Sequence, residues 1–228
     1  MQHKPQTKSR QRVIDHGEVF TAEREVNAML DLVKQETERI DSRFLEPACG
    51  TGNFLAEILR RKLEVVKSRY GKNPDDYERY ALIAVSSIYG VELLEDNCKE
   101  CRERLFEIWD KEYTAICKKY ANAETRDAVR YILKKNILCG DALTLLQSDD
   151  TPIIFAEWSA LNGCLIKRRD FKLSQMLEEH TPELQLDMFG ETGEYRYDEE
   201  GELVLAPVRE FPPVHYRRVG DVISTKEQ

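Results

Sequence analysis

The chain has no long apolar run, and none approaches the roughly 20 residues that a membrane-spanning helix needs. It also lacks the apolar core of a signal peptide, because residues 1–12 are polar and basic. Its six cysteines do not show the dense, regular spacing of a secreted disulfide framework. We therefore expect a reduced, cytoplasmic protein that makes no contact with a membrane.

Basic residues are also fewer than acidic residues. The chain has 42 acidic against 34 basic residues, which gives a formal net charge of −8. This excess of negative charge opposes a general attraction to DNA. If the protein meets DNA, a local basic patch or a partner subunit must hold it.

The cysteines and histidines do not show the spacing of a zinc site. Cys98 and Cys101 form a Cys-x-x-Cys pair, but no second such pair exists and the four histidines form no close pair. A structural zinc site needs about four ligands. The same spacing suits two small residues on one face of a helix. We therefore expect no metal.

The length of 228 residues is enough for one α/β domain with a sizeable core. We divide the chain into a polar N-terminal arm (1–16), a main domain (17–160) and a C-terminal appendage (161–228). The appendage is acidic, could form a hairpin within 195–206, and is then rich in proline, which discourages regular structure. We expect it to be partly irregular.

Short apolar segments alternate with helical periodicity through the main domain. We expect strands at 44–47, 88–92, 137–139 and 153–156, with helices before and between them. Apolar strands joined by helices favour a mostly parallel sheet with helices on both faces. Ligands then gather at the carboxyl ends of the strands.

The most specific segment is 45–55, Leu-Glu-Pro-Ala-Cys-Gly-Thr-Gly-Asn-Phe-Leu. Gly50 and Gly52 allow positive φ, and the turn opens a helix whose free N–H groups face the same point. Such a strand end, glycine turn and helix start form a small-molecule site. Glu92 and Asp141 end the next two strands, where a carboxylate can bind vicinal ribose hydroxyls.

Four segments, in order, resemble motifs of the S-adenosylmethionine-dependent DNA adenine-N6 methyltransferases of restriction-modification systems. Residues 17–21 resemble motif X, 46–54 motif I, 90–92 motif II and 140–143 motif III. The resemblance covers roughly residues 13–145. It implies a Rossmann-like class I methyltransferase sheet, here incomplete, in a degenerate relative or in one part of a split enzyme.

The resemblance also implies S-adenosylmethionine as the cofactor. Phe20 and Thr21 would contact its methionine moiety, Glu92 its ribose and Asp141 its adenine amino group. The candidate cofactor-binding residues are Phe20, Thr21, Glu46, Pro47, Ala48, Cys49, Gly50, Gly52, Asn53, Phe54, Glu92, Asp141 and Ala142.

The catalytic motif of this family is missing. Its members carry Asn/Asp-Pro-Pro-Tyr/Phe after the fourth strand, where the amide holds the target amino group and the ring stacks on the flipped adenine. Residues 153–159 read Ile-Ile-Phe-Ala-Glu-Trp-Ser instead, and the tetrapeptide occurs nowhere in the chain. Glu157 could accept a hydrogen bond from an amino group and Trp158 could stack on a base. Alternatively, Trp158 packs in the core and Glu157 is solvated.

Lys167, Arg168 and Arg169 form a compact basic cluster soon after the fourth strand. They could contact DNA phosphates, or they could belong to a solvated face.

Residues 185–189, Gln-Leu-Asp-Met-Phe, resemble the pentapeptide by which bacterial DNA-processing proteins dock on the replication sliding clamp. Gln185, Leu186, Met188 and Phe189 would make the contacts, because exposed apolar clusters seek a pocket. The alternative is that Leu186 and Phe189 pack against the domain.

Two main functions remain open. The first is an S-adenosylmethionine-binding protein that methylates adenine in DNA, if it is complete or is complemented by a methyltransferase or restriction subunit. The second is a catalytically inactive accessory or vestigial subunit that acts through partners such as the clamp. A methyltransferase for RNA or small molecules fits less well, because the sequence of residues 46–54 resembles motif I of the DNA enzymes.

Overall fold

The computed structural model describes residues 21–178, 195–197 and 203–221, together with residues 9, 11, 12, 14 and 19 of the N-terminal arm. The helices are α2 (Glu23–Asp31), α3 (Lys34–Thr37), α4 (Asn53–Tyr70), α5 (Pro74–Ser86), α6 (Glu95–Cys117), α7 (Ala123–Asn136) and α8 (Leu173–Glu178), with 3-10 turns η1 (Lys118–Tyr120) and η2 (Tyr216–Arg218). The strands are β1 (Phe44–Glu46), β2 (Ile88–Glu92), β3 (Ile137–Cys139), β4 (Ile154–Ala160), β5 (Leu165–Lys172), β6 (Tyr195–Tyr197), β7 (Leu203–Leu205), β8 (Arg209–Glu210) and β9 (Val214–His215).

Three parallel strands form the sheet that organises the domain, in the order β1-β2-β3. Leu45 pairs with Tyr89 and Val91 with Leu138, so the carboxyl ends of all three strands lie at one edge. The prediction of a mixed α/β domain with parallel strands and flanking helices is confirmed.

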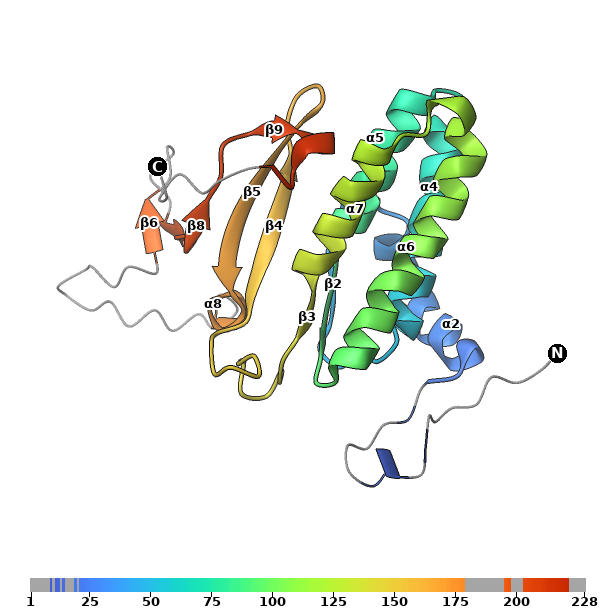
Figure 1. Cartoon of the computed structure of the whole chain (residues 1–228). Coiled ribbons are helices and arrows are strands. Elements are labelled where there is room, and N and C mark those ends of the chain that lie inside the picture. Colours follow the sequence, from blue (N-terminus) through green and yellow to red (C-terminus); the bar gives the residue numbers. More distant parts are fainter. Residues whose placement is uncertain are drawn as a thin grey trace.

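Helices α4 to α7 pack together and cover one face of this sheet (Figure 1). Two of them begin at asparagine caps: Asn73 accepts a hydrogen bond from the Asp75 N–H, and Asn122 accepts one from the Thr125 N–H. The apolar sides of these helices pack around β2, where Ile88 is buried. Helices α2 and α3 pack on the outside of α4.

The other face of the sheet is covered mainly by β4, which lies on the opposite side of β2 and β3 from the helices (Figure 1). Tyr89 and Val91 of β2 pack against Ile153 and Phe155, and the Tyr89 and Phe155 rings meet edge to face at 5.3 Å. The expectation of helices on both faces was therefore wrong for this second face. Only the short helix α8 joins β4 there among the described helices, through Leu173.

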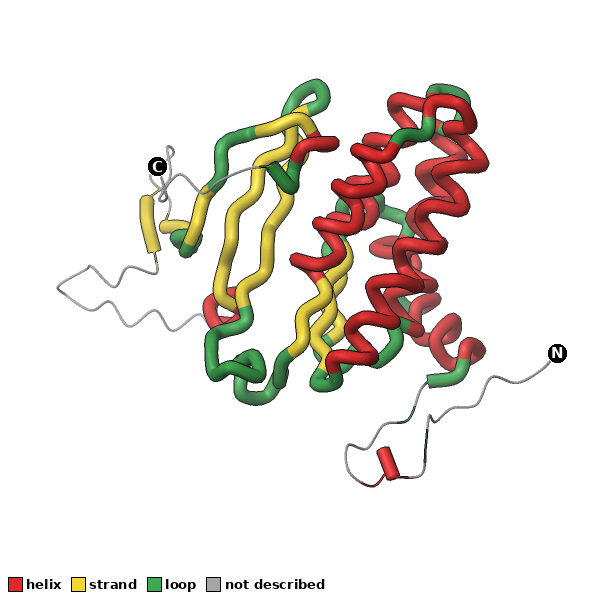
Figure 2. Tube along the Cα trace, viewed as in Figure 1, coloured by secondary structure: helices red, strands yellow, loops and turns green. Residues whose placement is uncertain are grey.

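The fourth strand does not extend the parallel sheet as predicted. Residues 140–153 form turns rather than a crossover helix (Figure 2), so the chain reverses after β3. Two isolated bridges, Asp141 with Leu146 and Leu146 with Pro152, shape this reversal. β4 then pairs antiparallel with β5 in a second sheet.

The segments after residue 160 complete the second sheet. β5 pairs with β4 along its length and also with β8 and β9, so the expected boundary after residue 160 falls inside a hairpin. Tyr216 and Val219 join the main core. The buried Glu78 of α5 accepts hydrogen bonds from the Tyr113 and Tyr216 hydroxyls and from Arg217 Nε. These contacts fasten the end of the described chain to the helical layer.

β6 and β7 form a separate antiparallel pair. No helix in the described part of the chain combines the length and the apolar character that a membrane span requires.

Candidate functional site

The glycine turn lies at the carboxyl end of β1 and leads into α4. Gly50 and Gly52 have φ of 53° and 82°, in the left-handed region that favours glycine. The Cys49 N–H donates to the Val91 carbonyl of β2 at 2.9 Å, and the Gly52 N–H donates to the Cys49 carbonyl at 2.8 Å. The turn is therefore tied to the end of the neighbouring strand.

Glu92 lies where the turn, β2 and α6 meet. The residue is 9% exposed, and its carboxylate accepts hydrogen bonds from the Gly50 N–H at 2.9 Å, the Leu94 N–H at 3.1 Å and the Asn97 amide at 3.3 Å. An ionised carboxylate offers about four acceptor positions. Glu92 can therefore accept one more hydrogen bond, and the long contact with Asn97 is the one most easily replaced.

Asn53 connects three segments at the start of α4. Its amide donates to the Thr21 carbonyl at 2.9 Å and its oxygen accepts from Arg104 of α6 at 2.6 Å. Arg104 also donates to the Thr51 carbonyl at 3.2 Å. The structure thus brings Thr21 next to the start of α4, beside the glycine turn. Phe54, the next residue, is half-buried and packs against the main core.

Glu46 ends β1 directly before the turn. Burial raises the pKa of its carboxyl group above its usual range, and a hydrogen bond from the Ala48 backbone acts in the opposite direction. Pro47 and Ala48 are exposed. This part of the turn is accessible to a ligand.

Asp141 follows β3 at the same edge. Its carboxylate accepts a hydrogen bond from the Leu143 N–H at 2.8 Å, and Gly140 N–H donates to the Glu92 carbonyl at 3.0 Å. Asp141 and Ala142 are half-buried, whereas Leu143 is 94% exposed and Leu93 is 55% exposed. Each of the two acidic positions is thus close in sequence to an exposed apolar side chain.

The glycines of the site also have a packing role that the sequence interpretation missed. A Cβ atom on Gly52 would lie 2.6 Å from the Cys101 Sγ, and one on Gly90 would lie 2.9 Å from the Cys49 Sγ. The hydrogen bond with Cys101 and burial both raise the pKa of Cys49, which keeps it a neutral thiol. These cysteines fill the space behind the turn.

Glu157 and Trp158 lie at the opposite edge of the parallel sheet from this site. Glu157 pairs with Arg43, which directly precedes β1, at 2.5 Å. Trp158 is 7% exposed and its indole N–H donates to Asn136, which directly precedes β3, at 2.8 Å. Because β4 runs back from the carboxyl edge, these side chains are separated from Glu92. Neither side chain therefore lies beside the glycine turn, and Trp158 packs in the core.

The three basic residues proposed to contact DNA each lie beside an acidic side chain. Arg168 is buried, donates to the Tyr131 hydroxyl at 2.7 Å and lies over the Phe211 ring. The ion pairs are Lys167 with Glu210 at 2.6 Å, Arg168 with Asp170 at 2.7 Å and Arg169 with Glu157 at 2.6 Å. Each of the three cations therefore has a carboxylate partner, although Glu157 also pairs with Arg43 and Asp170 also pairs with Arg209.

Several predicted residues lie outside the part that the structure describes. They are Phe20 of the motif X segment and the four docking residues Gln185, Leu186, Met188 and Phe189.

Sequence reasoning also missed residues that shape the site. Leu93 and Leu143 supply its exposed apolar surface, Asn97 and Arg104 hold the carboxylate and the turn, and Arg12 of the N-terminal arm contacts Asn97 at 3.3 Å. The sequence did contain a signal for Leu93, because this residue directly follows Glu92 at the end of a predicted strand.

Comparisons of the chain with protein-family models, with curated proteins and with solved structures found no match.

Proposed function

We propose that the chain binds S-adenosylmethionine at the carboxyl edge of β1, β2 and β3, as the Rossmann-like cofactor-binding part of a DNA adenine-N6 methyltransferase. The observation that carries this proposal is the direct hydrogen bond between the Gly50 N–H and the Glu92 carboxylate. It joins the glycine turn to an acid that can bind a ribose diol. Two segments 42 residues apart are thereby in direct contact, which supports a common site.

The residues at this edge fit the parts of the cofactor. A ribose hydroxyl would donate to Glu92 in its remaining acceptor position, and the second hydroxyl would replace Asn97. Asp141 would accept a hydrogen bond from the adenine amino group. The exposed side chains of Leu93 and Leu143 provide apolar surface for the flat ring. When bound, S-adenosylmethionine supplies an activated methyl group.

The half-buried Glu46 and the exposed residues Pro47 and Ala48 lie beside the turn, where the methionine moiety would bind. Thr21, which is held by Asn53, would close this end of the site. These residues bind and orient the cofactor.

Methyl transfer to adenine needs groups that hold the target amine at the same edge. Glu157 and Trp158 are at the other edge, so we propose that a partner chain supplies these groups and contacts the DNA. The ion pairs of Lys167, Arg168 and Arg169 favour this division of roles. The second candidate function is an inactive accessory subunit. It is supported by the same observation, the separation of Glu157 and Trp158 from the edge that carries Glu92.

Two experiments test the proposal. Isothermal titration of the purified chain with S-adenosylmethionine should give saturable binding of one equivalent, and no binding at millimolar cofactor would overturn the proposal. A tritiated methyl-transfer assay on unmodified DNA then separates the two candidates. Activity that appears only when a partner chain carrying an Asn-Pro-Pro-Tyr segment is added supports the complemented enzyme, and inactivity with every such partner encoded beside it supports the accessory role.

A further inference from the structure

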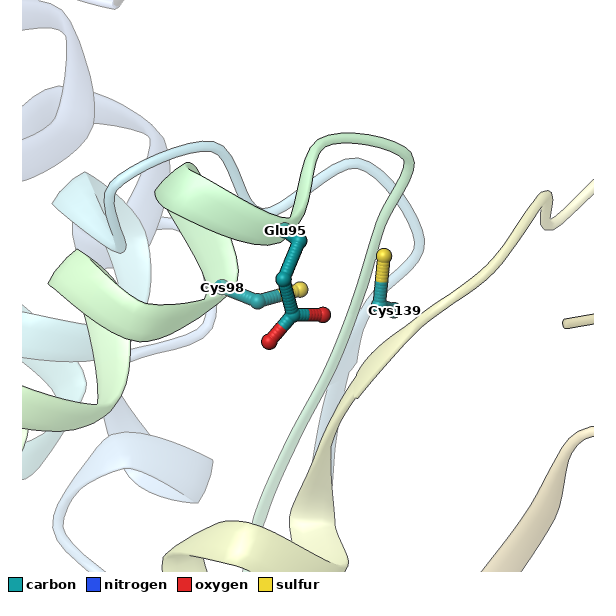
Figure 3. A group of neighbouring side chains, drawn as sticks. All are labelled: Glu95, Cys98 and Cys139. Carbon is teal, nitrogen blue, oxygen red and sulfur yellow. The ribbon is translucent and has the colours of Figure 1, made fainter. Parts of the chain in front are cut away.

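Glu95, Cys98 and Cys139 come together beside the carboxyl ends of β2 and β3 (Figure 3). Glu95 and Cys98 lie in the first turn of α6, three residues apart and hence on one face of the helix. Cys139 is the last residue of β3. One carboxylate oxygen and the two Sγ atoms all lie within 4.8 Å of one another.

The surroundings of the cluster combine a closed interior with a route from solvent. Cys98 is fully buried and its thiol donates to the Glu92 carbonyl at 3.6 Å. Cys139 is half-buried and donates to the Leu93 carbonyl at 3.5 Å, while Glu95 is largely exposed. An ion could therefore enter past Glu95 and Cys139.

We propose that Glu95, Cys98 and Cys139 bind one zinc ion, with a water molecule as the fourth ligand. Tetrahedral zinc with Zn–S bonds of about 2.3 Å separates two sulfur ligands by about 3.8 Å. The present separations of at most 4.8 Å exceed this value by no more than about 1 Å. Two sulfur ligands favour zinc over magnesium or calcium, which prefer oxygen ligands.

The charges in the cluster agree with a divalent cation. Binding requires both thiols to release their protons to solvent, which leaves two thiolates and one carboxylate around the ion. Arg102 lies beside them, with its Nη1 3.5 Å from Glu95 and its Nε donating to the Ile137 carbonyl at 2.9 Å. The three negative ligands, the zinc ion and this guanidinium together carry no net charge.

The proposed ligands differ from the Cys-x-x-Cys pair of the sequence. Cys101 points toward the glycine turn, where its Sγ occupies the space next to Gly52, whereas Cys98 faces Cys139. The ligand set thus connects α6 to β3, two elements that no covalent crosslink joins. Bound zinc would hold the start of α6, which follows Glu92, against the end of β3, which precedes Asp141, whether or not a cofactor binds there.

Cobalt titration of the full chain in a phosphine reductant tests this proposal, because thiolate-bound cobalt shows a charge-transfer absorption in the near ultraviolet. We expect the band to saturate at one equivalent and zinc to abolish it. Cys139→Ser and Cys98→Ser should remove most of the band, and Glu95→Gln should weaken cobalt binding by about tenfold or more. Cys101→Ser and Cys164→Ser should leave the titration unchanged.

Circular dichroism identifies any variant that fails to fold. Cys139→Ser and Glu95→Gln change accessible side chains, so they keep the test decisive if the buried Cys98→Ser variant unfolds. Absence of a thiolate band in the wild type would overturn the proposal. So would loss of the band in Cys101→Ser with retention in Cys139→Ser, which would assign the metal to the Cys-x-x-Cys pair.

Discussion

Lys62 of α4 is a buried lysine whose charge should make the stability of the domain depend on pH. Its side chain is 0% exposed and its Nζ donates to the Ile40 carbonyl at 3.1 Å, the Ser42 carbonyl and the Ser87 hydroxyl at 2.6 Å. These bonds hold the segment that leads into β1. Burial lowers the pKa of Lys62 from 10.5 to about 7, because the ammonium group loses its hydration.

The sign of the effect follows from the protons bound in each state. Between pH 7 and 10.5 the unfolded chain keeps the Lys62 proton, whereas the folded chain releases it, so the free energy of unfolding rises with pH. The slope is at most about 1.4 kcal/mol per pH unit. From pH 7 to 8.5 the gain is therefore up to about 2 kcal/mol, and it disappears below pH 7, where both states are protonated.

Urea unfolding of the wild type and of Lys62→Met at pH 6, 7, 7.75 and 8.5 measures this gain. The methionine side chain has a similar length and no titratable group, so subtracting its pH profile removes the contributions of other residues. The difference in unfolding free energy should favour the wild type increasingly as pH rises above 7. A flat difference, or one that falls with pH, would show that the three acceptors keep Lys62 charged and would refute the reasoning.

Two further substitutions test the packing of the site and of β4. Gly52→Ala should destabilise the domain by about 2–4 kcal/mol in urea unfolding, because it adds a clash with the Cys101 Sγ to the strain of positive φ. Gly163→Ala is the control, since Gly163 also has a positive φ, of 71°, but has open space around it, and this substitution should cost only about 1 kcal/mol. Equal costs would contradict the packing role. Trp158→Phe should cost about 1–3 kcal/mol, because it leaves the Asn136 oxygen unpaired, and should leave S-adenosylmethionine binding unchanged in calorimetry. A loss of cofactor affinity would contradict the separation of Trp158 from the site.

The glycine turn could be predicted from the sequence because its information is local. A strand end, two glycines and a helix start lie within 45–55, and the carboxyl ends of parallel strands necessarily meet at one edge. The alignment of Glu92 and Asp141 with the turn follows from that rule alone. The structure agrees with this prediction.

The course of β4 was missed because a short apolar run does not indicate strand direction. A parallel partner needs a crossover of a dozen or more residues, usually a helix. In the structure, residues 140–153 form turns and isolated bridges instead, and the chain reverses there. Its consequence, the displacement of Glu157 and Trp158 to the other edge, depends on that single reversal.

Contacts between distant residues could not be predicted. The cluster of Glu95, Cys98 and Cys139 joins positions more than 40 residues apart, and the burial of Lys62 depends on carbonyls from the segment before β1. Charge and composition give no signal for the cluster or for Lys62. A lysine on an amphipathic helix usually faces solvent, so the burial of Lys62 was not expected.

The most direct test of the account compares the affinity of S-adenosylmethionine for the wild type, Glu92→Gln and Glu157→Gln in isothermal titrations. Both substitutions remove one negative charge from an acid on a strand of the domain, but only Glu92 lies at the carboxyl edge with the glycine turn. We predict that Glu92→Gln weakens binding by about tenfold or more, since a hydrogen bond to a charged group contributes about 1.5–3 kcal/mol, and that Glu157→Gln binds as the wild type does. Equal affinities of all three proteins, or a selective loss in Glu157→Gln, would contradict the placement of the cofactor site.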